Sequence, residues 1–278
     1  MARGIYAVKT VRLIRSQPAS AAENMAVDEA LLSSVLRGGP PTLRLYRWRT
    51  PSFSAGRFQV VDEVLDRQAC AEEGVEIVRR PTGGGALFHH DEVTYAVCCR
   101  DEDLSLTGGV QASYRRLCSF LLRFYRSLGI PAEFAQDAGA PEQARSEICA
   151  AGREKHDIVV GGRKIGGNAQ RRVRAGILQH GAVPRTLNIQ LMRRCLRRAP
   201  AGLEQATTSL AEQLLAVPSL DEMSAGLVRA FEEAFEVPLA EESLTSEERR
   251  TAARLATEKY ANLAWSEKRD GAQTFVAP

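Results

Sequence analysis

The 278-residue chain lacks several features that would assign it to a function class at once. It has no apolar run of the length that a bilayer-spanning helix needs, and neither a P-loop nor a Rossmann glycine motif. Its net charge of +3 is too weak to indicate a nucleic-acid partner by itself. Because 44% of the residues are hydrophobic, the chain can bury a sizeable core. We therefore expect a globular protein with neither a membrane nor a nucleic acid as partner.

The cysteines lack the arrangements that disulfide frameworks and zinc sites require. Six are present, at positions 70, 98, 99, 118, 149 and 195, with no Cys-x-x-Cys pair and no histidine-rich cluster. This pattern is typical of reduced thiols in a cytoplasm, and the N-terminus has no continuous apolar segment of the kind found in secretory signals. Five of the cysteines lie in apolar or helical contexts. Only Cys149 is followed by small, polar and charged residues.

The spacing of apolar residues predicts interspersed helices and short strands. Helices are expected over 21–37 and about 110–128, and strands over 42–48, 75–80, 93–99 and 176–183. Ser20 is a suitable N-cap for the first helix, and Thr245 to Glu248 fits a capping box in a helical region that begins near 186. These elements predict an α+β fold of mixed, largely antiparallel sheets flanked by helices. We expect one domain over 1–278, with its core at about 20–240 and a helical C-terminal segment at about 241–278.

The first segment with chemical potential is RRPTGGGALFHHDEVTY, residues 79–95. Its three consecutive glycines let the backbone approach a ligand, because no Cβ intervenes. His89 and His90 follow at a strand entry, where alternation directs one side chain inward and the other outward. Arg79 and Arg80 are candidates to hold an anionic group. On its own the segment predicts a pocket floor, while a plain turn with solvated arginines stays an open interpretation.

The second segment is SEICAAGREKHDIVVGGRKIGGNAQRR, residues 146–172. Gly161 and Gly162 favour a tight hairpin turn, which places Lys164 in the second strand. Cys149 precedes the hairpin by a loop long enough to fold back over it. If the two side chains meet, the ammonium group favours the thiolate over the thiol, as a covalent thioester mechanism requires. The pattern alone also allows an inert loop thiol and a solvated lysine.

Three segments together resemble a known family. ENMAVDEALL (23–32), RRPTGGGALFHHDEVTY and HDIVVGGRKIGGNAQ occur in the order found in the lipoate-protein ligase, octanoyltransferase and biotin ligase superfamily. The resemblance covers roughly residues 20–260 and is greatest to the cysteine-dependent octanoyltransferases of the LipM type. Cys149 and Lys164 occupy the positions of the cysteine and lysine in that type. The sequence departs from the pattern at His89-His90-Asp91, where relatives tend to have His-Asp, so we match His89 and leave His90 unassigned.

The resemblance implies a function and a set of site residues. It implies the fold of the biotin/lipoate ligase catalytic domain and an octanoyl transfer in lipoate biosynthesis that needs no ATP, metal or other cofactor. Cys149, its thiolate stabilised by Lys164, would accept the octanoyl group from octanoyl-acyl carrier protein. A lysine of a lipoyl domain, in the glycine cleavage H protein or an E2 subunit, would then receive it. The implied substrate-binding residues are Arg79, Thr82, Gly83, Gly84, Gly85, His89, Gly167, Asn168 and Ala169.

Other readings of the same residues stay open. An ATP-dependent lipoate ligase would use Lys164 and leave Cys149 incidental, whereas an amidotransferase would move octanoyl groups between lipoyl domains. A non-enzymatic scaffold would use the glycine loop only as a groove. Arg194 and Arg198, and likewise Arg193 and Arg197, are expected one helical turn apart and form a candidate docking face for the acidic carrier protein, or else a solvated helix face.

Overall fold

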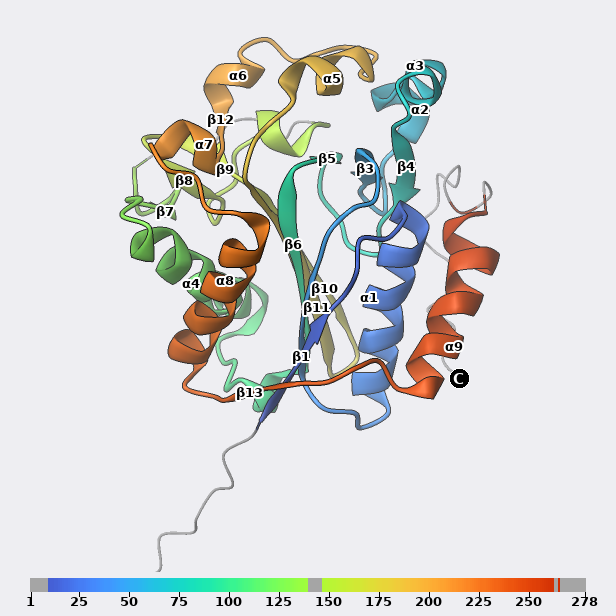
Figure 1. Cartoon of the computed structure of the whole chain (residues 1–278), viewed down its shortest axis with the longest axis vertical. Coiled ribbons are helices and arrows are strands. Elements are labelled where there is room, and N and C mark those ends of the chain that lie inside the picture. The colour runs from blue at the N-terminus through green and yellow to red at the C-terminus, as the bar shows by residue number, and fades with distance from the viewer. Residues whose placement is uncertain (1–9, 140–146, 263–264, 266–278) are drawn as a thin grey trace, which may run out of the picture.

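The centre of the protein is a six-stranded sheet. The computed structural model describes residues 10–139, 147–262 and 265, and Figure 1 shows the sheet edge-on between two helical layers. Its strand order is β10-β11-β6-β2-β1-β13. The strands are β1 (Val11–Arg15), β2 (Thr42–Tyr46), β6 (Glu92–Arg100), β10 (Gly167–Val173), β11 (Gly176–Pro184) and β13 (Leu239–Glu241). Three neighbouring pairs are antiparallel, whereas β1 pairs in parallel with both β2 and β13. The predicted α+β class with mixed sheets is confirmed.

Two smaller sheets lie at one end of the central sheet (Figure 1). One has the order β4-β3-β5 and the other the order β12-β9-β8-β7. Their strands are β3 (Ser52–Ala55), β4 (Glu76–Arg79), β5 (Leu87–His89), β7 (Glu133–Phe134), β8 (Ile158–Val160), β9 (Arg163–Ile165) and β12 (Thr207–Thr208). The predicted hairpin is confirmed, because β8 and β9 are antiparallel and both Gly161 (φ 55°) and Gly162 (φ 79°) adopt the left-handed conformation.

Helices cover both faces of the central sheet. The α-helices are α1 (Ala21–Leu36), α2 (Val61–Val64), α3 (Arg67–Glu72), α4 (Gly109–Ser127), α5 (Ile189–Arg194), α6 (Leu203–Ala206), α7 (Leu210–Gln213), α8 (Leu220–Phe235) and α9 (Ser246–Leu255). Short turns of other helical types are η1 (Asp101–Asp103), η2 (Cys149–Ala151) and the π-helical η3 (Ala256–Tyr260). The predicted caps are confirmed, since Ser20 and Thr245 each form a capping box with a glutamate three residues later. The helical pattern expected from 186 onward is interrupted by β12 and β13.

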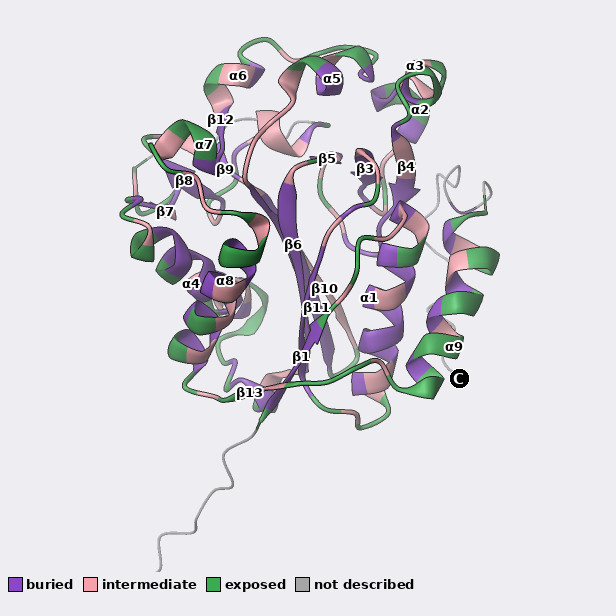
Figure 2. Cartoon of the chain, viewed as in Figure 1, coloured by how far each residue is buried: buried purple, intermediate pink, exposed green. Residues whose placement is uncertain are grey.

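The central sheet is buried on both sides (Figure 2). Alternate residues of β6 serve the two cores, because successive side chains of a strand point to opposite faces. Tyr95 and Val97 pack with α4 and α8, whereas Ala96 and Cys98 pack with α1. A third cluster joins the β4-β3-β5 sheet to α5 and buries Ile148 among its members. None of the helices in the described part of the chain is long and apolar enough to cross a membrane.

The first strand is joined to two elements near the C-terminal end of the described chain, β13 and α9. β1, which precedes the expected core start at residue 20, is buried and paired on both sides. Its Arg12 forms a buried ion pair with Glu248 of α9, with 2.6 Å between guanidinium nitrogen and carboxylate oxygen. The expected C-terminal helical segment therefore contains α9 and η3 after the end of β13, while positions 263–264 and 266–278 lie outside the described residues.

Candidate active site

Cys149 is held in a short turn against the end of the glycine loop. Its N–H donates to the carbonyl oxygen of Ala86 at 2.9 Å, and the N–H of Ala86 donates to that of Glu147 at 2.7 Å. The preceding residue, Ile148, is buried in the third core cluster. The turn is therefore anchored at Cys149 and at the two residues before it, while Cys149 itself stays half-buried.

The structure places Lys164 beside Cys149, although the two residues lie on different elements. The Lys164 Nζ is 3.4 Å from Cys149 Sγ and 2.9 Å from the Cys149 carbonyl oxygen. A third acceptor, Asp157 Oδ2, lies 2.8 Å from the same nitrogen. Lys164 and Asp157 are only 4% and 5% exposed. Burial alone would lower the pKa of Lys164, but the charges of Cys149 and Asp157 outweigh it and raise that pKa, so the group is an ammonium ion at neutral pH.

Asp157 was not among the residues that the sequence predicted. The register of the hairpin pairs Val159 with Lys164, and Asp157 lies two residues before Val159, immediately ahead of β8, where alternation directs its side chain to the same face. Such diagonal neighbours are within reach of a long side chain. The alternation of side chains along the residues before the Gly161-Gly162 turn was thus the signal that could have identified this carboxylate.

The other five cysteines differ from Cys149 in exposure. All of them are buried, and removal from water raises the pKa of each thiol, to about 12 for Cys70. The same direction and the same leading cause apply to Cys98, Cys99, Cys118 and Cys195. A buried thiol with a raised pKa is a poor nucleophile. Cys149 is thus the one cysteine suited to attack a substrate.

Cys149 lines a pocket between the central sheet and the β4-β3-β5 sheet. The cavity is small in this structure, with a volume of about 20 Å³. Met25, Trp48 and Leu87 provide apolar walls, and Ala169 of β10 lines the same space. Apolar side chains thus form part of the wall beside the sulfur atom.

Gly167 allows the cysteine to touch the edge strand of the central sheet. A Cβ at this position would lie 3.0 Å from Cys149 Sγ and 3.0 Å from Leu87 Cδ1. The neighbouring Asn168 lines the pocket, and its side-chain oxygen accepts a hydrogen bond from Tyr95 at 2.9 Å. The structure thus brings the predicted residues of the 167–169 segment together with Cys149.

The two arginines before the glycine loop have different environments. Arg79 is buried away from the pocket, where its guanidinium group donates to the carbonyl oxygens of Gly56, Gln59 and Trp265. We therefore move the predicted substrate contact from Arg79 to Arg80, which lines the pocket. Burial lowers the pKa of Arg80 to about 10, an effect that the negative charge of Cys149 partly offsets.

Arg80 also organises the glycine loop. It donates to the carbonyl oxygens of Gly83 and Gly85 at 2.6 and 2.8 Å. Gly84, with φ at +91°, lies between them in a conformation that favours glycine. The three predicted glycines thus form a loop that Arg80 holds by hydrogen bonds. Among the described residues, Arg80 lines the pocket and the three glycines do not.

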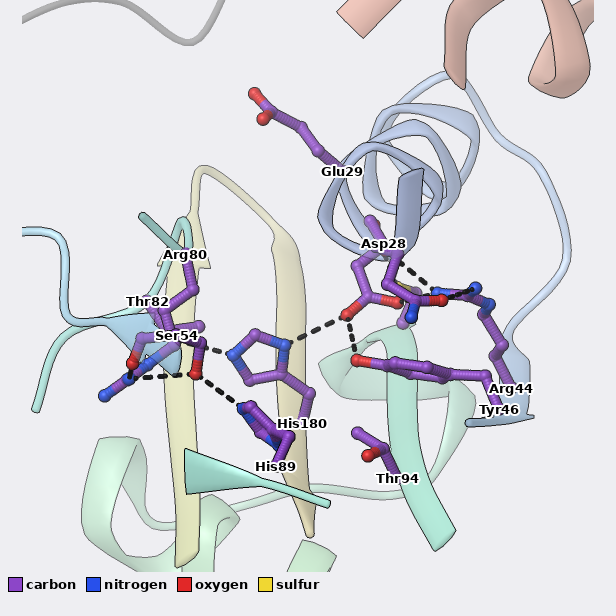
Figure 3. Close-up of polar contacts among 12 residues, drawn as sticks. Asp28, Glu29, Arg44, Tyr46, Ser54, Arg80, Thr82, His89, Thr94 and His180 are labelled. Atoms are coloured by element: carbon purple, nitrogen blue, oxygen red, sulfur yellow. Dashed lines mark hydrogen bonds and ion pairs between the residues drawn. The ribbon is translucent and has the colours of Figure 1, made fainter. Parts of the chain in front are cut away.

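A buried histidine connects Arg80 to helix α1 (Figure 3). His180 lies 3.0 Å from Asp28 through Nδ1 and 2.7 Å from the Thr82 hydroxyl through Nε2. Thr82 in turn accepts a hydrogen bond from Arg80 Nε at 3.1 Å. Burial lowers the pKa of His180 despite the nearby Asp28, which is consistent with a neutral ring that donates to the carboxylate and accepts from Thr82. Sequence reasoning missed His180 and Asp28, because nothing local distinguishes a polar residue that lines a pocket from one on a solvated face.

The predicted His89 forms a second chain of the same kind. Its Nδ1 lies 2.7 Å from Glu92 Oε1, and its Nε2 lies 2.7 Å from the Ser54 hydroxyl. Arg80 donates to that hydroxyl at 3.3 Å, so both carboxylate–histidine–hydroxyl chains end on Arg80 (Figure 3). Trp48 stacks on the His89 ring with 3.9 Å between centroids. His89 is buried and His90 exposed, as their alternation predicted.

The predicted arginine face is different in the structure. Helix α5 ends at Arg194, so Arg198 is not one helical turn from it. Arg194 forms an ion pair with Glu73, and Arg193 forms one with Glu204 at 2.7 Å. The part of this face that remains exposed beyond the helix is Arg197 and Arg198. As for metals, no group of three or more possible ligand side chains occurs within 10–139, 147–262 and 265.

Comparison with known proteins identifies the class to which this fold and site belong. The family model of the lipoyl protein ligase A/B catalytic domain matches residues 20–232, and the chain belongs to this family. Within the family the chain is similar to proteins named octanoyltransferase LipM. It is 34% identical to the one from Exiguobacterium sp., over 94% of this chain and 99% of the relative. It is 37% identical to the one from Kyrpidia tusciae, over 93% of this chain and 99% of the relative.

Solved structures agree with this assignment. A crystal structure of lipoate-protein ligase A bound with ATP superposes with a TM-score of 0.80 at 26% identity, covering 94% of this chain and all of the other. A bipartite lipoate protein ligase from Thermoplasma acidophilum shares the fold, with a TM-score of 0.78 at 23% identity over 96% of this chain and 99% of its own.

Proposed function

We propose that this protein transfers an octanoyl group to a lysine of a lipoyl domain through a thioester on Cys149, as one step of lipoate biosynthesis. Octanoyl-acyl carrier protein is the proposed donor, and the glycine cleavage H protein or an E2 subunit carries the acceptor domain. The observation that supports this proposal most is the contact of 3.4 Å between Cys149 Sγ and Lys164 Nζ beside an apolar pocket. We assign the activity to one catalytic domain spanning 1–278 and, because it uses a reduced thiol, to the cytoplasm.

In the first step the Cys149 thiolate attacks the carbonyl carbon of the donor thioester. A carbon–sulfur bond to Cys149 forms, the bond to the carrier sulfur breaks, and the carrier leaves as a thiol after taking a proton. Lys164 stabilises the attacking thiolate by charge and hydrogen bonding. Because β10 is an edge strand, some of its N–H groups have no strand partner, and in this proposal they donate to the carbonyl oxygen as it becomes negative.

In the second step the acceptor lysine attacks the Cys149 thioester. A carbon–nitrogen bond forms, the carbon–sulfur bond breaks, and Cys149 returns as a thiolate beside Lys164, while the amine loses a proton. Exchange between thioesters is nearly balanced and amide formation is favourable, so the sequence of steps needs no nucleotide. Met25, Trp48, Leu87 and Ala169 hold the acyl chain in this scheme, and His89, Arg80, Gly167 and Asn168 shape the reactive end.

Intact-mass spectrometry tests this proposal. Wild-type protein incubated with octanoyl-acyl carrier protein and no nucleotide should gain one octanoyl mass, which hydroxylamine removes. The Cys149→Ala variant should gain none and should not modify an acceptor lipoyl domain. An unmodified wild type would overturn the proposal. Offering an octanoylated lipoyl domain as the donor distinguishes this activity from an amidotransferase, which would prefer that donor.

An ATP-dependent lipoate ligase is the second candidate. The favouring observation is the similarity to lipoate-protein ligase A, whose crystal structure contains ATP. In that case the chain would attach lipoate to a lipoyl domain only with ATP present, and Cys149→Ala would retain the activity. Loss of all modification in Cys149→Ala excludes this candidate.

A further inference from the structure

The Cys149 thioester would form next to an amine of the enzyme itself. We propose that Asp157 keeps Lys164 from capturing the octanoyl group, by holding its amine in the protonated, non-nucleophilic state while the thioester exists. This inference rests on the proposed thioester and assigns a protective role to a residue outside the reaction itself. Asp157 acts through Lys164 and is a positioning residue.

The geometry makes self-acylation a real hazard. Lys164 Nζ lies 3.4 Å from the sulfur atom, and the acyl carbonyl carbon would be bonded directly to that sulfur. Atoms held about 3 to 3.5 Å apart are in the range from which bonds form readily. The step is balanced without any other reactant: the carbon–sulfur bond breaks, a carbon–nitrogen bond to Lys164 forms, and a proton moves from nitrogen to sulfur. The product is an amide, so the enzyme would be permanently blocked.

Acylation removes one of the two negative charges near Lys164. The free thiolate stabilises the ammonium group, but a thioester is neutral and no longer does so. Burial without a counter-charge lowers the pKa of a lysine and so favours the uncharged, nucleophilic amine. The chain therefore needs a negative charge that acylation does not remove.

Asp157 meets this requirement. It is 2.8 Å from Lys164 Nζ, it is almost completely buried, and it lies immediately before β8 rather than on the Cys149 turn. Its carboxylate also accepts the N–H of Glu154 at 2.8 Å, and its carbonyl oxygen accepts the N–H of Ala135 at 2.8 Å. These bonds keep the carboxylate in place whatever the state of Cys149.

The test uses the full chain and octanoyl-N-acetylcysteamine, a small thioester donor. Wild-type protein should carry only octanoyl groups that hydroxylamine removes, located on Cys149 by peptide mapping. Asp157→Asn should accumulate an octanoyl group that resists hydroxylamine, located on Lys164, and should lose transfer activity as it accumulates. Asp157→Glu should restore the labile pattern, and the double variant Asp157→Asn/Lys164→Arg should form no stable adduct.

Glu212→Gln is the matched control, because it also removes a carboxylate paired with a residue of β9, Arg163, but on the surface. It should behave as the wild type. Asp157→Ser is the second variant in case Asp157→Asn does not fold. If the variant that folds carries only octanoyl groups that hydroxylamine removes, the inference is overturned. The proposed function is unaffected by that outcome. A wild type that takes up no octanoyl group would instead overturn the proposed function.

Discussion

Cys149 is fixed by three different kinds of contact. Its main chain is hydrogen bonded to Ala86, its sulfur atom lies against Gly167, and the same sulfur atom is 3.4 Å from Lys164 Nζ. The first contact fixes the position of the residue, the second sets the approach to β10, and the third favours the thiolate. Each contact can be removed separately, so the contribution of each to reactivity can be measured.

Removing the cation should slow the thiol reaction. An ammonium group beside a thiol favours the thiolate, which is the reactive form. We therefore expect Lys164→Gln to slow the alkylation of Cys149 by iodoacetamide at pH 7 at least about tenfold, as measured by mass spectrometry. Lys155→Gln, which removes an equal charge from an exposed position nearby, should alkylate like the wild type. Equal rates in Lys164→Gln and wild type would contradict the role given to Lys164.

Adding one methyl group should displace the sulfur atom. Gly167→Ala places a carbon about 3.0 Å from Sγ, so the sulfur atom must move by a few tenths of an ångström, and a misplacement of about 1 Å can cost about a hundredfold in rate. We expect single-turnover acylation to fall by about tenfold or more. Gly226→Ala crowds Phe124 to a similar degree within the α4–α8 contact, at 2.9 Å. This control should lower the melting temperature without changing acylation, and a loss of acylation there as well would contradict a local effect.

At the scale of elements, the ion pair between β1 and α9 joins the start of the described chain to its end. Burial acts to raise the pKa of Glu248, but hydrogen bonds from Arg12 and from the Thr245 backbone outweigh it and lower the pKa below its ordinary value of 4.5. A carboxylate with a lowered pKa in the folded state contributes stability above that ordinary value. The contribution disappears as the pH falls through the lower pKa of the folded protein.

Glu248→Gln should therefore destabilise the protein in a pH-dependent way. At pH 7 we expect the free energy of unfolding to fall by about 3 kcal/mol, because Arg12 is left buried without its counter-charge. The difference from wild type should shrink as the pH is lowered below 4.5, which urea unfolding at a series of pH values measures. Glu247→Gln, at an exposed ion pair with Arg37, should cost less than about 1 kcal/mol. A difference that grows on acidification would refute the assignment.

The elements that the sequence predicted correctly depend on local signals. The Gly161-Gly162 turn and the capping boxes at Ser20 and Thr245 are set by residues a few positions apart. β1 was missed because its partners are β2 and β13, and its pairing with β13 spans more than two hundred residues. The choice between Arg79 and Arg80 likewise depends on which face of β4 meets the pocket, and no local pattern contains that information.

At the scale of the whole molecule, the arginine face lies near the reactive cysteine. The cluster that buries Leu196, next to Arg197, also buries Ile148, next to Cys149. A partner that contacts the exposed arginines would thus be close to the turn that contains the sulfur atom. We therefore expect the donor carrier protein to dock at these arginines. The surface of α9, which packs outside α1 (Figure 1), is the less suitable site.

Reversing these charges should weaken recognition of the carrier. We expect Arg197→Glu/Arg198→Glu to raise the KM for octanoyl-acyl carrier protein about tenfold at low salt, and less at high salt because salt screens surface charges. The KM for octanoyl-N-acetylcysteamine should stay unchanged. Arg250→Glu/Arg254→Glu on α9 is the matched control, and both donors should be used normally by it. An unchanged KM for the carrier in the first variant would exclude this face as the docking surface.

The burial of five cysteines has a practical result for anyone who works with this protein. A chromogenic disulfide reagent added to the native protein should consume one equivalent per chain, and five more should appear only on unfolding. The first equivalent counts working molecules, so turnover can be expressed per competent active centre rather than per milligram. Mild peroxide would oxidise the sulfur atom of Cys149 first, so samples kept without a reductant would lose turnover long before they lose their fold.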